Sequence, residues 1–450
     1  MNGVHEVAVS GAGIGGLGVA LSLAHGGVQS VVFERQHDWS EVGAGVQLGP
    51  NATRRLKAWG LEAALERCAS WPKSVEVFDG VGAELLATLP LGEQCQTRYG
   101  APYATLLRAD LQTMLRKRVD QLGFTDVRLG EKLLHASVHG ADRLTDGDLL
   151  HLPQDQGIEF DIQAQLFGGD SGAGGANETS ELNAHRQSHS AQVLVGADGV
   201  FSRLRQTHFQ KAPLQYTGHL AYRALIPWSD LPVSMRSSSV RLFWAPGLHW
   251  VQYPVNTGES LNVVVLLEVA PSQGVKGVED LSQQRRFLSN PWNEKTSASF
   301  DQHQDLQSLL LALQRAHGQL RDVAGLVNTW TVWPLFAAPP LRSAEDMARG
   351  GLALLGDAAH PMLPYLAQGA GMSIEDAQVF SMCWGESRLS VSERVRRYAE
   401  LRWQRCAKVQ RQAMSNANVF HLGQPLRFMR NMAMRTLGAR LLDMPWLYSH

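Results

Sequence analysis

The opening of the chain alternates short apolar runs with a helical pattern of small residues. Val4–Ser10 and Val31–Phe33 are apolar runs, and Ile14–His25 carries small and apolar side chains at helical spacing. Short apolar runs on either side of such a pattern are typical of buried parallel strands joined by a helix. The first residues therefore predict a strand–helix–strand unit.

Later segments follow other patterns. Alternation over Ser74–Thr88 predicts antiparallel strands, and Leu107–Leu122 predicts an amphipathic helix. Between His219 and Val269, runs of aromatic and β-branched residues predict a second region that is rich in β-sheet. Asp280–Leu320 and Ser392–Leu442 predict helices, the latter rich in Arg and Leu. The whole pattern favours an α/β fold with a separate sheet-rich part.

Residues 168–190 consist of small and polar residues. Such a segment cannot bury enough apolar surface to offset the entropy of ordering its backbone. We expect a flexible insertion in a hairpin, without a function of its own.

Composition narrows the function classes. The 450 residues carry a formal net charge of −1, and 44% of them are hydrophobic. A nucleic-acid-binding protein would show an excess or a face of basic residues, and no apolar run reaches the roughly 18–20 residues that span a bilayer. The four cysteines are far apart and lack metal-ligand spacing. We expect a cytoplasmic protein with reduced thiols, without nucleic acid, bound metal or stable membrane association.

A glycine-rich turn follows the first strand. Gly11, Gly13 and Gly16 match the pattern G-x-G-x-x-G between a strand and a helix, and Gly15 lies in the same run. The first glycine permits a tight turn, the second lets the backbone approach a pyrophosphate, and the third lets helix and strand pack closely. Glu34 ends the second strand, where a carboxylate can accept hydrogen bonds from a ribose diol. The unit predicts a dinucleotide site, and the acidic residue favours FAD or NAD over NADP.

A second motif lies in the last third of the chain. Asp357 follows a short apolar strand, and Gly369-Ala370-Gly371-Met372 precedes a helix expected from Ser373. A carboxylate beside a helix start can accept hydrogen bonds from polyol hydroxyls, while the helix amides face an electron-rich ring. Taken alone, Asp357 could equally be a structural helix cap. Together with the turn at Asp198, the two motifs favour a flavin that lies across one composite domain.

In these motifs the chain resembles the class A flavoprotein monooxygenases, the single-component group that contains salicylate hydroxylase, 3-hydroxybenzoate 6-hydroxylase and 6-hydroxynicotinate 3-monooxygenase. The matching motifs stand in the family's order over nearly the whole chain. They are GAGIGG at 11–16, Glu34-Arg35, GAGVQLGPN at 43–51, LRADL at 107–111, GADGVFSRLR at 196–205 and GDAAHPMLPYLAQGAGMSIEDA at 356–377.

The resemblance implies FAD as the cofactor, with NADH or NADPH as a transient co-substrate that reduces it once an aromatic substrate is bound. Reduced flavin would take up O2 as a C4a-hydroperoxide that attacks a phenol ring, while the protein positions the ring and excludes water. The residues that we expect to contact FAD are Gly11, Gly13, Gly15, Gly16, Glu34, Arg35, Arg108, Asp198, Asp357, Gly369, Ala370, Gly371 and Met372.

The same resemblance implies a p-hydroxybenzoate hydroxylase fold, in which a Rossmann-like FAD-binding domain carries an inserted sheet-rich substrate domain and C-terminal helices. We expect the FAD-binding domain at 1–72, 101–212 and 341–390, and the substrate domain at 73–100 and 213–340. The helical region at 391–450 would cover the FAD-binding domain or form a dimer surface, and a homodimer stays open.

The substrate side carries weaker signals. Gln47 lies in a glycine-rich loop where relatives place a substrate-side residue, and Pro361 is expected beside the flavin ring edge. His219 is a candidate catalytic base, because its charge state changes near neutral pH. His219 and Tyr222 are three apart on one strand, so they should point to opposite faces. On family resemblance, Tyr222 is the preferred one of the two.

Two further residues are candidates for substrate binding, and one residue departs from the family pattern. Arg223 could clamp a substrate carboxylate or lean on the flavin domain, and Trp333 lies in the segment expected to return over the ring. The family's usual Gly-Gln-Gly appears here as Ala367-Gln368-Gly369. We expect this alanine to need only a negative φ.

The leading hypothesis is an FAD-dependent monooxygenase that uses NAD(P)H and O2 to hydroxylate a small hydroxylated aromatic acid, with or without decarboxylation. One alternative is an epoxidase or quinone-precursor hydroxylase with a bulkier apolar substrate, suggested by the Arg- and Leu-rich C-terminal helices. Another is a non-catalytic flavin-binding protein, since the sequence assigns no catalytic base. The aromatic substrate, the regiochemistry and the choice between NADH and NADPH stay open.

Overall fold

The computed structural model describes residues 3–39, 44–138, 158–164, 185–209, 213–269 and 302–449. Most of the polar segment 168–190 and the first part of the helix expected at 280–320 lie outside these residues. His185–Ser190, the end of that polar segment, begins strand β10 (His185–Gly196) and pairs with β9 (Ile158–Ala164). Here the prediction of a flexible insertion is wrong, because the neighbouring strand satisfies the backbone hydrogen bonds.

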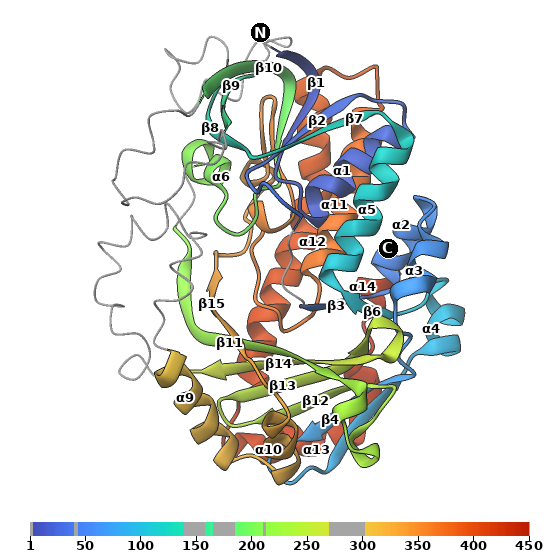
Figure 1. Ribbon diagram of the computed structural model, residues 1–450, viewed down its shortest axis with the longest axis vertical. Helices are drawn as coiled ribbons and strands as arrows, with labels where there is room; N and C mark the ends of the chain where they lie inside the picture. Colours follow the sequence, from blue (N-terminus) through green and yellow to red (C-terminus); the bar gives the residue numbers. More distant parts are fainter. Residues whose placement is uncertain are drawn as a thin grey trace, which may run out of the picture.

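The first sheet is built on the predicted strand–helix–strand unit, which the structure confirms (Figure 1). β1 (Gly3–Ser10) lies between β10 and β2 (Ser30–Glu34) and is parallel to both. The strand order is β16-β17-β10-β1-β2-β7. β9 extends the sheet by antiparallel pairing with β10, and β8 pairs with β9 in turn. The other strands are β7 (Thr125–Leu129), β8 (Glu131–Val138), β16 (Ala348–Arg349) and β17 (Leu352–Leu354).

Helices cover this sheet. α1 (Ile14–His25) packs against α5 (Arg108–Leu122) and α11 (Gly369–Trp384). Most residues of α1 are buried, which explains why its sequence is small and apolar all round rather than amphipathic. α12 (Val391–Phe420) lies along α11 and runs from the first sheet toward the second (Figure 1).

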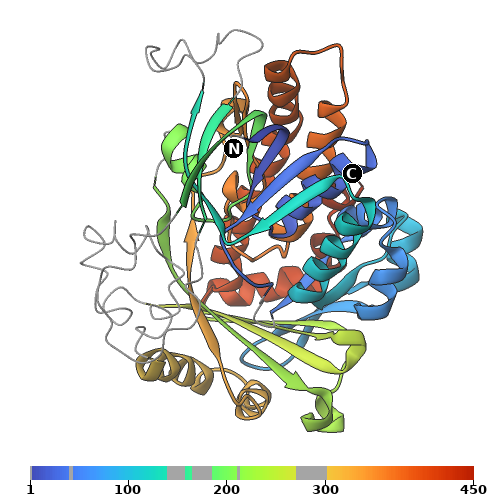
Figure 2. The same ribbon diagram turned by 45° about the horizontal axis from the view of Figure 1, so that its top comes forward.

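The second sheet has the strand order β15-β11-β14-β13-β12-β4-β5. α9 (Gln302–Gln314) and α10 (Gly318–Gly325) cover the face that is turned away from the first sheet, as the two ribbon views show (Figures 1 and 2). We call the opposite face, which is turned toward the first sheet, the inner face. The strands are β4 (Ser74–Asp79), β5 (Leu85–Pro90), β11 (Gln215–Pro227), β12 (Val240–Ala245), β13 (Leu248–Val255), β14 (Ser260–Glu268) and β15 (Thr331–Ala337).

Shorter elements lie between and beside the two sheets. β3 (Gly45–Leu48) and β6 (Ala104–Leu107) form a separate two-stranded pair. The remaining helices are α2 (Pro50–Ala58), α3 (Glu62–Cys68), α4 (Gly92–Tyr99), α6 (Arg203–His208), α13 (Leu426–Leu442) and α14 (Pro445–Tyr448).

One expectation about the last third of the chain needs correction, and another holds only for part of the C-terminal region, because α12 packs on α11 while α13 packs elsewhere. α11 begins at Gly369 rather than near Ser373, so the glycine-rich run is the first turn of the helix. The C-terminal region is two long helices, and α13 packs on β5 of the second sheet. There a Cβ on Gly438 would lie 2.3 Å from the Ala87 Cβ.

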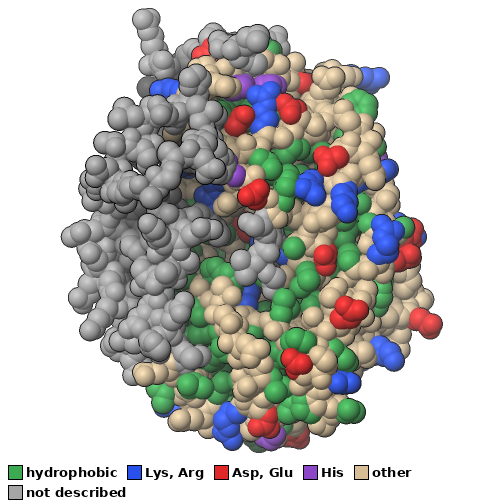
Figure 3. All heavy atoms as spheres, in the orientation of Figure 1, with side chains coloured by type: hydrophobic (Ala, Val, Ile, Leu, Met, Phe, Trp, Pro, Cys, Tyr) green, Lys and Arg blue, Asp and Glu red, His purple; other side chains and the backbone are tan. Residues whose placement is uncertain are grey.

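The surface of the described part is mixed in character. On the face in Figure 3, basic and acidic side chains are interspersed among apolar ones, in keeping with the formal net charge of −1. Among the described helices, none is both long and apolar enough to cross a membrane.

A network of buried charges joins α11 to α12 and to the loop before α11. Asp376 accepts hydrogen bonds from Arg402 Nε and from the His360 ring, each at 2.6 Å, and from the Gly356 backbone at 3.0 Å. The three side chains are nearly inaccessible to solvent. The network therefore fixes the loop at Gly356 relative to both helices.

The neighbouring Glu375 extends this network to the chain ends. Its carboxylate accepts from Arg402 and Arg405 at 2.7 Å, and Asn51 of α2 donates to it at 2.7 Å. Arg405 also donates to the backbone oxygen of Leu447 in α14 at 2.7 Å. Segments that are hundreds of residues apart in the chain thus share one carboxylate.

Loss of the Glu375 charge should destabilise the protein in a pH-dependent way. Burial alone would raise the pKa of Glu375, but Arg402 and Arg405 outweigh burial and lower it to about 2 from its ordinary 4.5. Because the folded-state pKa is depressed, this stability is present above about pH 5 and is lost as the pH falls toward 2. We expect Glu375→Gln to lower the free energy of unfolding by about 3–5 kcal/mol at pH 7, and by less at acid pH. Urea denaturation at several pH values measures the difference.

Glu386→Gln is the matched control, because Glu386 pairs with Arg397 at 3.2 Å on the surface. An exposed pair of this kind contributes less than about 1 kcal/mol. The role given to the buried network is contradicted if the two variants lose similar stability, or if the loss in Glu375→Gln is the same at every pH.

Candidate functional site

Four chain segments meet at the carboxyl edge of the first sheet. The parallel register pairs Ser10 with Phe33 and with Gly196, and Gly196 with Leu354. The residues that follow these strand ends therefore lie side by side, at the edge where parallel α/β sheets bind ligands. They include four residues expected to contact FAD: Gly11, Glu34, Asp198 and Asp357.

In the glycine-rich turn, a Cβ would fit without contact at one glycine and would come too close to a neighbouring atom at the other three. Gly11 has a φ of +102°, and a Cβ there would lie 2.5 Å from the Ala197 oxygen. A Cβ on Gly15 would lie 2.7 Å from a Leu355 methyl, and one on Gly16 would lie 1.8 Å from the Gly11 oxygen.

A Cβ on Gly13, by contrast, would meet nothing within 4 Å. The backbone there borders open space at the N-terminus of α1, where helix amides lack intrahelical partners. A pyrophosphate fits this arrangement.

Glu34 and Arg35 close the turn at the end of β2. The Glu34 carboxylate accepts hydrogen bonds from the Ala12 amide at 2.8 Å and from the Gln36 amide at 2.9 Å. Burial lowers the pKa of Arg35, while Glu34 and Asp198 act in the opposite direction. The carboxylate is therefore held within the turn, where an acid is expected to meet a ribose.

Asp198 lies in the turn after β10 and has an unpartnered oxygen. One carboxylate oxygen accepts from the Arg203 amide at 2.9 Å, and Oδ1 is buried without a hydrogen-bond partner among the described residues. Burial raises the pKa of Asp198, against hydrogen bonds from Ser202 and Arg203. A polar group of a ligand would satisfy Oδ1.

Arg205 ties this turn to the second motif. Its guanidinium donates to the backbone oxygens of Asp357 at 3.2 Å and Ala358 at 3.1 Å, and to that of Val200. The three motifs quoted from the sequence are thus one structural unit.

Asp357 lies beside the start of α11 without capping it. The N-cap of α11 is Gln368, and a Cβ on Gly369 would lie 3.8 Å from Asp357 Oδ1. The structural-cap alternative for Asp357 is therefore wrong. The carboxylate and the first amides of α11, from Gly369 to Met372, instead flank one place at the sheet edge.

The expectation for Ala367 is also wrong. Its φ is +52°, in the left-handed region, rather than negative. That conformation costs a residue with a Cβ about 1–2 kcal/mol relative to glycine. The glycine usual in the family at this position avoids the cost, and the charge network around Asp376 holds the loop in spite of it.

Gln47 and Arg108 belong to the β3–β6 pair and the helix that follows it. Gln47 is opposite Thr105, and Arg108 begins α5 directly after β6. The Gly45 amide donates to Asn262 Oδ1 of β14 at 2.8 Å, and a Cβ on Gly45 would lie 2.5 Å from Asn262 Cγ. This loop therefore lies directly against the inner face.

Gln47 belongs to a cluster of polar and aromatic residues on the inner face. Gln47 Oε1 accepts a hydrogen bond from Tyr103 at 2.8 Å, and its side chain also bonds to Tyr253. The guanidinium of Arg223 lies near Tyr253 and stacks over Trp333, 5.2 Å from the ring centroid. We call Gln47, Tyr253, Arg223 and Trp333 the inner-face cluster.

Arg223 is a partly buried cation without a carboxylate partner among the described residues. Its Nε atom is buried and makes no hydrogen bond in this part of the chain. Burial lowers the pKa of Arg223, which Tyr253 raises and Arg108 lowers further. Such a group strongly favours an anion that enters the cluster.

Tyr222 and His219 lie on opposite faces, as the strand alternation predicted. β11 pairs with β14 in unbroken register from His219 to Pro227. Tyr222 is fully buried and packs edge-on against Trp330, in the core beneath α9 and α10. The Tyr222 ring therefore lies in the core on the side of the sheet that is turned away from the inner face, and a role in contacting substrate stays a prediction.

His219 points to the inner face but does not join the inner-face cluster. Its ring contacts Tyr365 and His421, with centroids 5.9 and 5.2 Å away. Pro361 is buried in the loop between Asp357 and α11, and its backbone oxygen accepts from Gln410 at 3.2 Å. Pro361 is thus placed in the loop that separates the flavin edge from the inner face.

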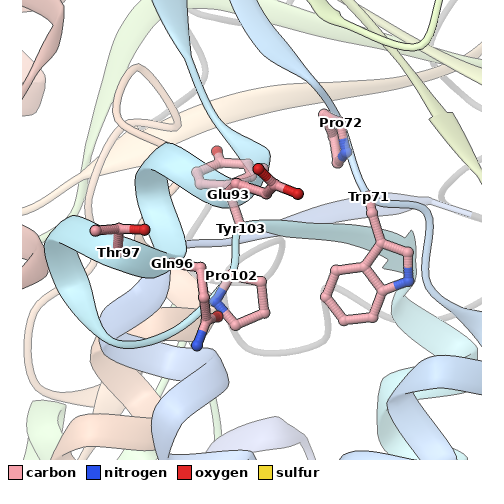
Figure 4. A pocket seen from close by; sticks show the side chains of 8 residues that line it. Trp71, Pro72, Glu93, Gln96, Thr97, Pro102 and Tyr103 are labelled. Carbon is pink, nitrogen blue, oxygen red and sulfur yellow. The ribbon is translucent and has the colours of Figure 1, made fainter.

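A surface hollow lies on the outer side of Tyr103 (Figure 4). It is lined by Trp71, Pro72, Gly92, Glu93, Gln96, Thr97, Pro102 and Tyr103. None of these residues was a candidate for substrate or cofactor binding. The Tyr103 hydroxyl donates to Gln47 while its ring lines the hollow, so the hollow borders the inner-face cluster without containing it.

The sequence left three residues of the site without a role. Arg205 stands inside a quoted motif, but its contacts to Asp357 are long-range. Asn262 is a polar residue in an otherwise apolar strand, which is a readable sign of a specific contact. Tyr253 lies in β13, which is buried at every position, so no pattern distinguishes it.

Comparisons with known proteins agree with this geometry. A family model described as FAD binding domain matches residues 5–385. The chain is 29% identical over 406 residues to 3-hydroxybenzoate 6-hydroxylase 1 of Aquipseudomonas alcaligenes, with 90% of this chain and 87% of the relative covered. It is 31% identical over 424 residues to 3-amino-4-hydroxybenzoate 2-monooxygenase of Streptomyces cremeus, with 93% and 88% covered. A salicylate hydroxylase substrate complex shares the fold with a TM-score of 0.70 at 21% identity, over 99% of this chain and 95% of the other.

Two glycines of the same turn should respond differently to alanine. Gly13 has room for a Cβ and a φ of −72°, so Gly13→Ala should leave the stability of the FAD-free protein within about 0.5 kcal/mol. It should weaken FAD binding about tenfold or more, because the methyl group takes the space where the pyrophosphate would approach. Flavin fluorescence titration and urea denaturation give the two quantities.

Gly16→Ala is the counterpart, because its Cβ would lie 1.8 Å from a backbone oxygen. This variant should lose stability even without FAD. If Gly13→Ala binds FAD as wild type does, or is destabilised as strongly as Gly16→Ala, the open space at Gly13 is not the pyrophosphate site.

Proposed function

The chain belongs to the FAD-binding-domain family and is an FAD-dependent aromatic monooxygenase, and we propose that it hydroxylates a small hydroxylated aromatic acid with O2 and NADH or NADPH. Both relatives named above act on a benzoate that carries a ring hydroxyl, according to their names. The inner-face cluster offers the matching chemistry for such a substrate.

The observation that carries the proposal is the partly buried guanidinium of Arg223, which has no carboxylate partner among the described residues and whose Nε is buried without a hydrogen bond there. A buried cation without a counter-charge is costly, and the cost falls when a carboxylate binds. The planar fork of arginine holds a carboxylate through two hydrogen bonds. Trp333 stacks on the same guanidinium, so an aromatic acid would meet a cation and a ring face together.

FAD fits the carboxyl edge of the first sheet. The pyrophosphate would lie at Gly13, the ribose at Glu34, and the polyol chain and ring near Asp357 and the first turn of α11. Bound FAD supplies the redox chemistry that activates O2. The protein supplies the orientation of the substrate and the exclusion of water.

In the inner-face cluster, the side chains act as hydrogen-bond partners and not as general bases. Burial raises the pKa of Tyr253, against opposing effects of Arg223 and Gln47, so the phenol stays protonated at neutral pH. Gln47 fixes the orientation of Tyr253 and Tyr103 by side-chain hydrogen bonds. We propose that the Tyr253 hydroxyl orients the substrate, and we assign no general base in the cluster.

One observation favours a second candidate function. On α13, Leu426, Phe428 and Met429 are 52%, 61% and 64% exposed. Exposed apolar side chains on one helix fit an enzyme that takes a bulky apolar substrate from a membrane surface or a carrier. The two candidates differ in whether the enzyme turns over aromatic acids or bulky apolar compounds.

The experiment that tests the function is NADH and NADPH oxidation by the purified, FAD-loaded protein with a panel of hydroxybenzoates, hydroxynicotinates, simple phenols and bulky apolar aromatics. We expect an aromatic acid to stimulate oxidation and to gain one oxygen atom, as mass spectrometry would show. Loss of CO2 in the same product would identify a decarboxylative reaction. Turnover of the bulky compounds alone would favour the second candidate, and no response to any ring would favour a non-catalytic flavoprotein.

Arg223→Met should separate acid recognition from folding. We expect the KM for an acidic substrate to rise about 100-fold, from the loss of a buried charge-assisted pair. The melting temperature should not fall, because the substitution removes a partly buried cation that has no carboxylate partner among the described residues. Steady-state kinetics and thermal unfolding provide the two measurements.

Arg241→Met is the control, since Arg241 lies in the same sheet and pairs with Glu76 at 3.1 Å. It should leave the KM unchanged. An Arg223→Met enzyme with wild-type KM for acids, or one that no longer folds, would show that Arg223 is structural.

A further inference from the structure

A group of two histidines and one glutamate lies away from the inner-face cluster. His219 is on β11, Glu268 ends β14 opposite it, and His421 is the C-cap of α12. One nitrogen of each imidazole and one carboxylate oxygen lie within 4.8 Å of one another. The separation of His421 Nδ1 and Glu268 Oε2 is 3.7 Å. Ligand atoms of a tetrahedral zinc ion are about 3.3 Å apart, given bonds of about 2.0–2.1 Å.

The second nitrogen of each histidine is held by a hydroxyl group. His421 Nε2 lies 3.3 Å from the Tyr365 hydroxyl, and His219 Nδ1 lies 3.3 Å from Thr217 Oγ1. Metal-binding histidines are oriented by such a bond on the nitrogen that does not bind the ion. His421 Nδ1 is buried and has no hydrogen-bond partner among the described residues. It is therefore an unsatisfied donor or acceptor that faces a carboxylate.

The charge state of the imidazoles suits metal binding. Burial lowers the pKa of His421 to about 3, with further lowering by His219 and Arg430. Burial also lowers the pKa of His219, while Glu268 raises it. Burial therefore favours the neutral form of each ring, which is the form that binds an ion.

Arg430 is the cation that acts on His421, but its charge is shared with other partners. Its guanidinium donates to the Phe420 oxygen at 2.8 Å and to the Asn431 side chain at 2.9 Å, and lies 4.0 Å from Asp79. The Glu268 side chain is 60% exposed, so the group can be reached from solvent.

We propose that His219, Glu268 and His421 form a binding site for a divalent transition-metal ion, with zinc as the best match. Two imidazoles and a carboxylate are a common three-ligand set for this ion and leave one position for water. The ion would join β11 and β14 of the second sheet to the end of α12. Because Tyr365 bonds to His421, the ion would also be connected to the loop before α11. The proposal does not depend on the identity of the aromatic substrate.

Zinc binding to the full-length, FAD-loaded protein tests the proposal directly. After removal of metals with a chelator, a titration with ZnCl2 against a chromophoric competitor should show one tight equivalent. Glu268→Gln and His219→Gln should each weaken that equivalent at least about tenfold. Addition of zinc should raise the melting temperature of wild type but not of these variants.

Glu259→Gln is the matched control, because Glu259 is an exposed carboxylate at the other end of β14. It should bind zinc as wild type does. Glu268 is exposed enough that its substitution should not impair folding, so a negative result is interpretable. Cobalt in place of zinc should give visible ligand-field absorption in wild type that is absent in Glu268→Gln.

Two outcomes would overturn the proposal. One is a wild-type protein without a saturable zinc equivalent. The other is a zinc equivalent that Glu268→Gln and His219→Gln retain unchanged, since the ion would then bind elsewhere among the histidines of the chain.

Discussion

The buried carboxylates of α11 hold the last third of the chain against the first, and the cofactor site depends on them. Asp376 accepts from Arg402, His360 and the Gly356 amide, so the shape of the loop that carries Asp357 is set by hydrogen bonds to one side chain. Glu375 binds Arg402, Arg405 and Asn51, so α2 and α12 are fixed to the same helix. Removing either carboxylate would leave buried guanidinium groups unpaired, which costs more than the pair contributes.

This constraint explains how strained backbone is tolerated beside the proposed flavin site. Ala367 is in the left-handed region, and the loop from Asp357 to Gln368 has little regular secondary structure. The strain is compatible with a single conformation because both ends of the loop are held by the charge network. The same loop contributes Tyr365 to the inner face, so the cofactor edge and the second sheet are coupled through a few residues.

The parts of the structure that could be read from the sequence are the local ones. The turn at Gly11–Gly16 is encoded by neighbouring residues. The strand before it, the helix after it and Glu34 all belong to one strand–helix–strand unit. The alternation of β11 predicted that His219 and Tyr222 face opposite ways. It could not say which face is turned toward the cofactor, because that depends on where α9 and α10 pack. Family resemblance therefore favoured Tyr222, while the structure places Arg223 in the cluster.

The long-range contacts could not be read at all. Arg402 of α12 bonds to Asp376 of α11, and Asn262 of β14 bonds to Gly45 of the β3–β6 pair. No spacing in the chain encodes either pair. The sign of φ at Ala367 was predicted wrongly for a related reason. Surrounding tertiary contacts impose the left-handed conformation, and an alanine in the sequence does not indicate it.

Arg402 and Arg223 differ in whether a carboxylate of the protein accompanies the charge. Burial lowers the pKa of Arg402, but Asp376 and Glu375 outweigh burial and raise it well above its ordinary value. The pKa of Arg223 is lowered, because burial acts on it without a carboxylate to oppose it among the described residues. The first charge is already satisfied within the protein and holds the fold. The second has no carboxylate partner among the described residues, which is the reason for proposing that it binds the carboxylate of an aromatic acid beside Trp333.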